Sequence, residues 1–161
     1  MNTIKQEIIL KLILIFSVFA ILSAYFIQYV LGYQPCNLCL IERIPYISSI
    51  IIISIFLFTN KFEKLFLLIL SLIFFSATII AFYHFSIEQG FINESFVCDL
   101  NNKSNNLSKE ALLNQLKEMP VNCKDVTFKI FGLSLATFNI FISLTLSVIT
   151  TKIFLTYEKN R

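Results

Sequence analysis

Long apolar segments separated by shorter polar ones dominate the chain. Residues 12–31 contain no charge over about 20 positions, the length that a helix needs to cross a bilayer core about 30 Å thick. Three further apolar segments follow at 44–59, 65–83 and 130–149. The pattern predicts an all-α membrane protein, a four-transmembrane-helix bundle forming a single integral membrane domain over residues 1–161. The two longer connections, at about 32–43 and 84–129, then lie on one side.

Composition supports this fold class. The chain is 57% hydrophobic, contains 18 Phe and only 3 Gly, and is 14% charged, which does not describe a soluble domain of this length. The first apolar segment is too long for the central region of a signal peptide, and no small-x-small cleavage site follows it before Tyr33. We therefore expect the first segment to remain as a membrane span.

The charges predict an orientation. Four spans place both ends of the chain on one side, and that side is more basic than the other. Its basic residues are Lys5, Lys11, Lys61, Lys64, Lys152, Lys159 and Arg161, and its acidic residues are Glu7, Glu63 and Glu158. In the long outer segment from Ser86 to Lys129, five lysines meet six acids. The bias of Lys and Arg towards the cytoplasm predicts cytoplasmic termini and two extracytoplasmic loops, where disulfides persist.

The long outer loop has a predicted helix of its own. Residues 107–120 read as a short helix with Ser108 as N-cap and Pro120 beyond its end. Its apolar side would suit a position on the membrane surface, although packing on the bundle or on a partner, or a plain solvated helix, would use the same residues. Cys98 and Cys123 bracket this segment, so a bond between them would close the loop.

The chain has four cysteines, and two of them form a CxxC pair at the membrane surface. Cys36 and Cys39 follow the first apolar segment directly. Thiol exchange needs a thiolate, and a helix N-terminus or a nearby cation lowers a cysteine pKa enough to supply one. Arg43 offers such a cation four positions after Cys39, although an interfacial arginine reaching for lipid headgroups is the alternative.

Pro45 decides where the second span begins. A helix running from Cys36 would force the ring of Pro45 against the carbonyl of Ile41. We therefore predict that the helix begins near Ile44, with Pro45 in its first turn.

Metal binding and purely structural disulfides are the rival interpretations of the cysteines. Zinc sites made of four cysteines usually combine two closely spaced, CxxC-like cysteine pairs, whereas Cys98 and Cys123 stand twenty-five positions apart. We expect no metal centre. A structural disulfide remains open for Cys98 and Cys123, but a bond between Cys36 and Cys39 closes too small a ring to stabilise much.

The segment Pro35-Cys36-Asn37-Leu38-Cys39-Leu40-Ile41-Glu42-Arg43 resembles the quinone-proximal motif of the disulfide bond formation protein B family (DsbB). Four spans with a CxxC after the first and a second cysteine pair in the last loop are also the pattern of that family. Tyr83-His84 with Ile87 to Gly90, and the segment from Gly132 to Ala136, are similar to it as well. Vitamin K epoxide reductase-like proteins instead place the CxxC after the loop pair.

The resemblance implies a thiol:quinone oxidoreductase of the bacterial inner membrane. A reduced DsbA-like periplasmic thiol oxidase would attack the Cys98/Cys123 disulfide, Cys98 forming the mixed disulfide. Electrons would pass to Cys36/Cys39 and then to a quinone, ubiquinone or menaquinone, with Cys39 contacting the quinone and Cys36 exchanging with the loop pair. Arg43 would hold the quinone headgroup or stabilise charge beside it.

His84, the only histidine, stands at the predicted outer end of the third span. There it would donate a hydrogen bond or proton to a quinone carbonyl, or serve only as an interfacial side chain. Gly132 and Ala136 have the small-xxx-small spacing of close helix packing. Phe138 stands where the family's fourth span often begins with Trp.

Two alternative functions remain at this stage. One is a non-catalytic membrane adaptor whose docking loop is stapled by a disulfide, and the other is a vitamin K epoxide reductase-like enzyme. Lipid is the expected surrounding, and nucleic acid is not an expected partner.

Overall fold

The computed structural model describes residues 3–59, 63–93, 123–124, 129–130 and 132–159. Within these ranges the helices are α1 (Thr3–Tyr29), α2 (Asn37–Ile41), α3 (Arg43–Thr59), α4 (Glu63–Glu88) and α6 (Leu135–Lys159), and the strands are β1 (Lys129–Ile130) and β2 (Leu133–Ser134). The surface helix predicted at 107–120 and Cys98 lie outside the described residues.

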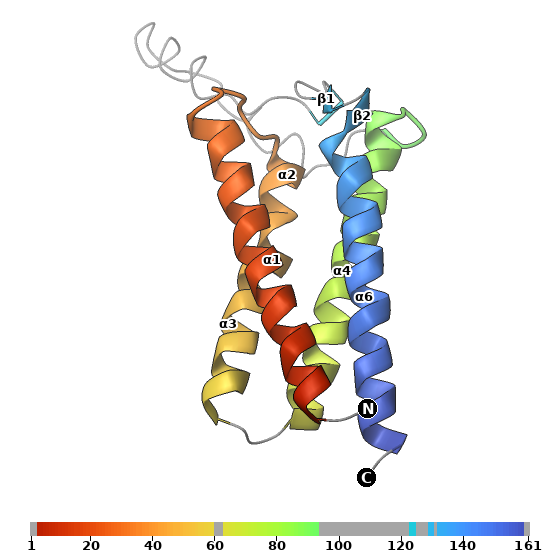
Figure 1. The fold of residues 1–161 in the computed structure, drawn as a ribbon. Helices are drawn as coiled ribbons and strands as arrows, with labels where there is room; N and C mark the ends of the chain where they lie inside the picture. The colour runs from red at the N-terminus through yellow and green to blue at the C-terminus, as the bar shows by residue number, and fades with distance from the viewer. Residues whose placement is uncertain (1–2, 60–62, 94–122, 125–128, 131, 160–161) are drawn as a thin grey trace, which may run out of the picture.

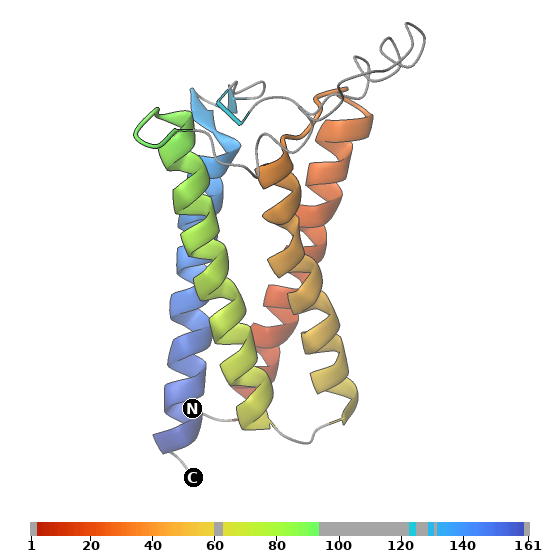
Figure 2. The same ribbon diagram turned by 180° about the vertical axis from the view of Figure 1, so that it is seen from behind.

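Within the part of the chain that the structure describes, four helical segments are long and apolar enough to cross a membrane, which confirms the predicted all-α bundle. They are Gln6–Tyr29, Asn37–Thr59, Glu63–Glu88 and Leu135–Thr156. Helix α4 packs along α6, α1 along α3, and α3 against α4. Both termini lie at one end of the bundle, and α2, β1 and β2 lie at the other (Figures 1 and 2).

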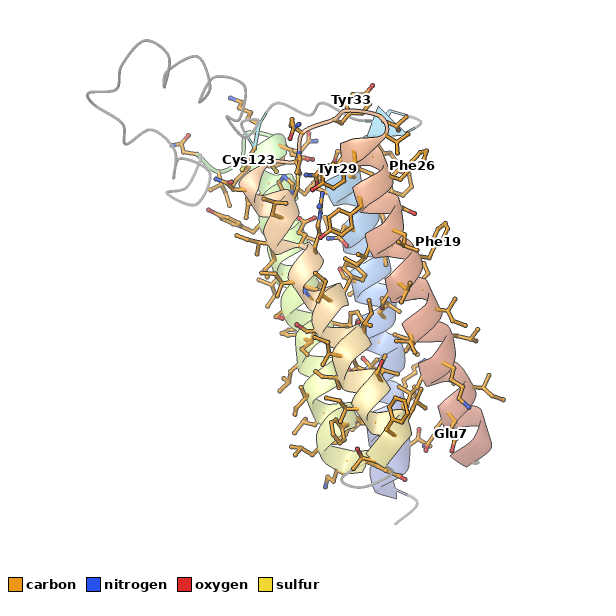
Figure 3. All side chains as sticks on the ribbon, turned by 90° about the vertical axis from the view of Figure 1, so that its left-hand side faces the viewer. Glu7, Phe19, Phe26, Tyr29, Tyr33 and Cys123 are labelled. Carbon is orange, nitrogen blue, oxygen red and sulfur yellow. The ribbon has the colours of Figure 1, made fainter. Side chains whose placement is uncertain are left out.

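Large apolar side chains cover the outside of the bundle. Phe19 and Phe26 on α1 point away from the other helices (Figure 3), and Phe19 is 66% exposed. Lipid tails are as apolar as these side chains, so their exposure costs nothing in a bilayer, and close packing must hold the helices together. A cluster of buried apolar side chains in the half of the bundle nearer the termini includes Ile53, Leu70 and Phe74, which are at most 1% exposed.

A one-residue break at Glu42 separates α2 from α3. The proline ring of Pro45 removes the hydrogen bond that would reach Ile41 and clashes with its carbonyl, so a continuous helix cannot pass this point. Helix α2 ends at Ile41, and α3 begins at Arg43 with Pro45 in its first turn. Helix α3, the second predicted span, thus begins one residue before the predicted Ile44. Helix α2 was not predicted from the sequence.

The last two long helices differ from their predicted bounds. Helix α4 continues past Tyr83 to Glu88, where Gly90 closes its end with a φ of 76° and Phe91 N–H donates to the carbonyl of Ser86. Helix α6 does not begin near residue 130.

A β-hairpin occupies the start of the predicted fourth span. In it Lys129 pairs with Ser134 and Ile130 with Leu133. Gly132, at a φ of 82°, lies in the hairpin turn, a backbone conformation that favours glycine. The predicted packing pair of Gly132 and Ala136 on one helix is therefore wrong.

Candidate functional site

The CxxC pair sits on the short helix α2, and the first cysteine caps it. Cys36 is the N-cap residue, and its Sγ accepts a hydrogen bond from the backbone N–H of Cys39 at 3.2 Å. Both thiols are free, with Cys36 5% exposed and Cys39 partly buried. A hydrogen bond from the Cys39 side chain lowers the pKa of Cys36 to about 5, with His84 adding to the effect and burial opposing it. The helix end and its neighbours therefore favour a thiolate at Cys36.

His84 reaches the CxxC pair from α4. Its side chain is only 3% exposed, its Nε2 lies 3.5 Å from Cys36 Sγ, and its Nδ1 lies 2.8 Å from Glu42 Oε1. The carboxylate fixes the orientation of the imidazole, so that Nε2 faces the sulfur. The group of Cys36, His84 and Glu42 has the order of nucleophile, base and orienting acid.

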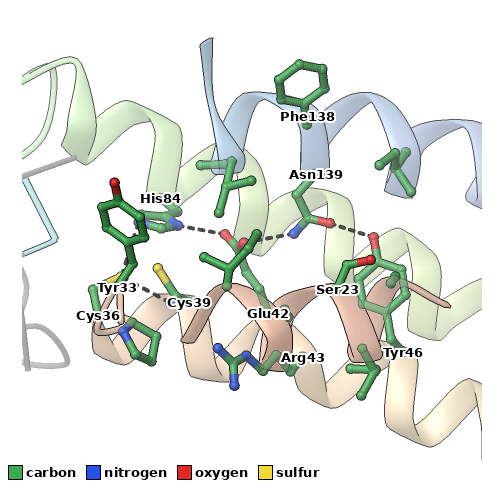
Figure 4. A pocket seen from close by; sticks show the side chains of 18 of the residues that line it. Ser23, Tyr33, Cys36, Cys39, Glu42, Arg43, Tyr46, His84, Phe138 and Asn139 are labelled. Atoms are coloured by element: carbon green, nitrogen blue, oxygen red, sulfur yellow. Dashed lines mark hydrogen bonds and ion pairs between the residues drawn. The ribbon is translucent and has the colours of Figure 1, made fainter. Parts of the chain in front are cut away.

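The second oxygen of Glu42 extends this group across the bundle. Asn139 on α6 donates from Nδ2 to Glu42 Oε2 at 2.8 Å, and the Tyr46 hydroxyl donates to Asn139 Oδ1. Figure 4 shows the resulting chain from His84 through Glu42 and Asn139 to Tyr46. Glu42, at the break between α2 and α3, thus contacts α4 through His84 and α6 through Asn139.

A second carboxylate stands on the other side of His84. Glu88 lies one turn further along α4, and its Oε1 is 3.7 Å from His84 Nε2. Its other oxygen accepts a hydrogen bond from the Ser134 hydroxyl. Ser134 also accepts from the backbone N–H of Thr137 at 3.2 Å, which makes it the cap of α6. The hairpin therefore positions Ser134, and Ser134 in turn holds Glu88 beside the histidine.

Arg43 is held by α1. Its guanidinium donates to Gln28 Oε1 at 2.7 Å and lies over the ring of Tyr25, 5.1 Å from the centroid. The contacts described for Glu42 go to His84 and Asn139, so Glu42 is not placed to neutralise Arg43 by direct contact. A fixed positive charge is therefore available close to the dithiol.

The two CxxC cysteines, His84, the two carboxylates and Arg43 line one pocket of about 370 Å³ (Figure 4). Its polar and sulfur-bearing lining consists of Ser23, Tyr33, Cys36, Cys39, Glu42, Arg43, Tyr46, His84, Glu88, Cys123 and Asn139, and the rest is apolar, including Phe16, Ile27, Leu135 and Ile142. The structure thus brings together five of the six site residues predicted from the sequence. The sixth, Cys98, lies outside the described residues.

Cys123 comes from the long loop but packs at the CxxC pair. It is 3% exposed, and it forms a buried cluster with Cys36, Leu38 and Ile87. Cys123 is disulfide-bonded, whereas Cys36 and Cys39 are free. A dithiol and a disulfide sulfur therefore meet at the same end of the bundle, which is the arrangement that thiol–disulfide exchange requires.

Comparison with known proteins adds the family. The model of the family described as "Disulfide bond formation protein DsbB" matches residues 6–153, nearly the whole chain. The protein belongs to the DsbB family. It is also similar to RP370 of Rickettsia prowazekii (strain Madrid E), described as an uncharacterized protein. The two are 29% identical over 152 residues, covering 91% of this chain and 88% of the relative.

DsbB membership makes the protein a disulfide-forming membrane oxidoreductase and implies a quinone as cofactor. The pocket suits such a group, since its volume lies in the range of small-molecule sites and its walls are apolar with a few convergent polar groups. Arg43 and His84, the two quinone-binding residues predicted from the sequence, both line it. When bound, a quinone accepts two electrons and two protons.

Three site residues were not assigned a role from the sequence of this DsbB-family protein. Glu42 was named only as part of the family motif, and Glu88 and Asn139 carried no function. A signal existed for Asn139, because a polar amide inside an otherwise apolar span is costly unless it has a partner. Nothing in the sequence indicated that this partner would be Glu42.

Proposed function

We propose that this DsbB-family protein is a thiol:quinone oxidoreductase that reoxidises a DsbA-like periplasmic thiol oxidase. One observation carries the proposal: a free dithiol, a disulfide-bonded cysteine from the long loop, a cation and a histidine line the same pocket. An adaptor stapled by two disulfides has no need of an apolar cavity beside its cysteines.

The proposed relay has two exchanges followed by quinone reduction. A thiolate of the reduced partner attacks the disulfide of Cys98 and Cys123 at Cys98, and the partner's second thiol then resolves the mixed disulfide. The partner leaves oxidised, and the loop pair holds two electrons and two protons as thiols. The loop pair then reduces the disulfide of Cys36 and Cys39 in the same way, which regenerates its own disulfide.

The second cysteine pair delivers these electrons to the quinone. Cys36 receives them, because it packs beside Cys123. Cys39 lines the pocket that would hold the quinone, and the Cys36–Cys39 disulfide would form again as two electrons and two protons pass to that acceptor. The free dithiol of the structure corresponds to the state immediately before this last step.

His84 and Arg43 handle the proton and the charge. The Nε2 atom of His84 is placed to accept the Cys36 proton, and Glu42 on Nδ1 stabilises the imidazolium that results. Arg43 is fixed in the pocket wall by Gln28 and Tyr25, so it stabilises negative charge on the quinone oxygens without having to reorient.

We further propose that the redox end faces the bacterial periplasm. Both termini lie at the bundle end opposite the CxxC pair (Figure 1), and the basic residues of the sequence gather at that end. The termini would then be cytoplasmic, and the loop cysteines would meet a periplasmic partner.

The test is anaerobic mixing of the purified protein in detergent with a reduced DsbA-type oxidase and excess quinone, while quinone absorbance is followed. Ubiquinone and menaquinone are used separately. We expect rapid quinol formation by the wild type and none by Cys39→Ser. Arg43→Gln should raise the KM for quinone, and Arg43→Lys, which keeps the charge, should recover part of the loss. Folded wild-type protein that reduces neither quinone would overturn the proposal and favour the adaptor.

A further inference from the structure

The two CxxC thiols and His84 form a cluster of three metal-ligand atoms. Cys36 Sγ, Cys39 Sγ and a ring nitrogen of His84 all lie within 4.8 Å of one another. Two thiolates and an imidazole are ligands that Zn²⁺ prefers, and a Cys₂His set with a fourth open position is a known zinc arrangement. The redox role of the pocket does not by itself require this geometry.

The spacing of the cluster agrees with tetrahedral coordination. Bond lengths of about 2.3 Å to sulfur and 2.0–2.1 Å to nitrogen place two ligands of a tetrahedral zinc about 3.6 Å apart. Cys36 Sγ and His84 Nε2 are 3.5 Å apart. A metal ion bonded to both atoms would therefore need little movement of either side chain.

Glu42 supplies a second, independent observation. Metal-binding histidines almost always donate their other ring N–H to a carboxylate, a carbonyl or water, which fixes the tautomer and leaves a lone pair towards the metal. His84 Nδ1 lies 2.8 Å from Glu42 Oε1, and Asn139 holds the other carboxylate oxygen. His84 is thus oriented as a histidine ligand would be, with Nε2 facing the sulfurs.

The charges around the cluster also suit a cation. Glu42 and Glu88 flank His84 on its two sides, with Glu88 Oε1 3.7 Å from Nε2. Arg43, the cation of the pocket lining, is turned to Gln28 and Tyr25 on α1. The pocket also reaches the loop residues Tyr33 and Pro35, which gives a hydrated ion a route from the surface.

We propose that the dithiol form of the protein binds one thiophilic divalent cation, Zn²⁺ in particular, through Cys36, Cys39 and His84. Binding releases the proton shared by Cys36 and His84 and the thiol proton of Cys39, and it forms two metal–thiolate bonds and one metal–imidazole bond, with no change of oxidation state. The disulfide form has no thiolates to offer, so the cation selects the reduced state and blocks its reoxidation. The site is an inhibitory one and is independent of whether the electron acceptor is a quinone.

The test uses Cd²⁺ as a probe, because cadmium–thiolate bonds absorb in the ultraviolet. The full chain in detergent is reduced with a phosphine, freed of reductant under anaerobic conditions and titrated with Cd²⁺, and Zn²⁺ is then added in competition. A second series uses the Cys98→Ser/Cys123→Ser variant, which leaves only the CxxC thiols. We expect one equivalent to bind in both proteins, and no absorbance change after Cys36 and Cys39 have been oxidised.

Variants test whether the cation is bound by a preorganised site that includes His84 or by the two cysteine thiols alone. Glu42→Gln keeps the size of the side chain but weakens its hold on Nδ1, and we expect affinity to fall about 10- to 100-fold, as for other partners of ligand histidines. His84→Gln should weaken binding further. Arg43→Gln is the matched control, since it changes the same pocket without touching a ligand, and it should not weaken binding.

Two results would overturn the inference. One is the absence of the cadmium–thiolate absorbance band when Cd²⁺ is added to the reduced wild type. The other is an equal affinity for Cd²⁺ in the wild type, Glu42→Gln and His84→Gln. Both are read without quinone or partner, so a failure of the relay proposal would leave this test unaffected.

Discussion

The two ends of the bundle bury different kinds of side chains. Near the termini, the core is mainly apolar, with residues such as Ile53, Leu70 and Phe74. Among the described residues there, its polar contacts are limited to hydroxyls, such as Ser71 with Thr151 and Thr150 with carbonyls of its own helix. At the other end, polar side chains from separate helices bond to one another around His84. The first end holds the helices together, and the second fixes the orientation of a few reactive atoms. Substitutions at the two ends should therefore change different measured quantities.

The largest effect is expected from Cys36→Ser at the polar end. Turnover should fall to the uncatalysed level, because the loop pair loses the thiol with which it exchanges. Stability should be retained, since serine is a favoured N-cap residue and keeps the cap of α2. Quinol formation and thermal unfolding are measured together, and alkylation followed by mass spectrometry reports the loop pair.

After mixing with reduced partner, the loop cysteines of Cys36→Ser should accumulate as thiols, whereas those of the wild type return to the disulfide. A variant that still turns over would mean that Cys36 is not on the electron path.

At the apolar end, Phe74→Ala should act on stability alone. Phe74 is fully buried and packs edge to face against Tyr46, so its removal leaves a cavity and should cost about 3 kcal/mol of unfolding free energy. Turnover per folded molecule should stay within about twofold of the wild type. Leu72→Ala is the control, because Leu72 is 58% exposed towards lipid and little packing is lost. Equal destabilisation by the two substitutions would show that the core does not depend on Phe74.

His84→Gln should show the opposite profile to Phe74→Ala. We expect quinol formation to fall about 100-fold, the typical contribution of a positioned acid–base group, with a smaller change in stability. Ser86→Ala is the matched control on the same helix, since its buried hydroxyl donates only to the backbone of Phe82. Stopped-flow traces of quinone absorbance measure both variants. Unchanged turnover in His84→Gln would reduce the histidine to a packing role.

The difference between the two ends also explains what the sequence can and cannot predict. The spans follow from apolar length alone, because the bilayer imposes one thickness on every helix. The break before Pro45 follows from a local clash, so the start of α3 was predicted to within one residue. Both depend on properties of neighbouring residues.

The polar network depends instead on how helices are rotated about their axes. Glu42 and Asn139 are ninety-seven positions apart and meet only because two helix faces turn towards one pocket. The start of α6 was predicted too early for a related reason. The residues around the turn at Gly132 are mostly apolar, so hydropathy alone assigns them to the span.

Tyr46 joins the two ends, and Tyr46→Phe should have the smallest effect of the four. Its ring packs in the apolar core against Phe74, with centroids 6.3 Å apart, while its hydroxyl donates to Asn139. Phenylalanine keeps the ring and removes only the hydrogen bond, which leaves the Asn139 oxygen without this donor and should cost about 1 kcal/mol. Because Asn139 still donates to Glu42, turnover should fall by less than the loss in His84→Gln. Unfolding free energy and quinol formation measured on one preparation decide the matter. A loss of turnover as large as that of His84→Gln would place Tyr46 in the reactive network and move the boundary between the two ends into α3.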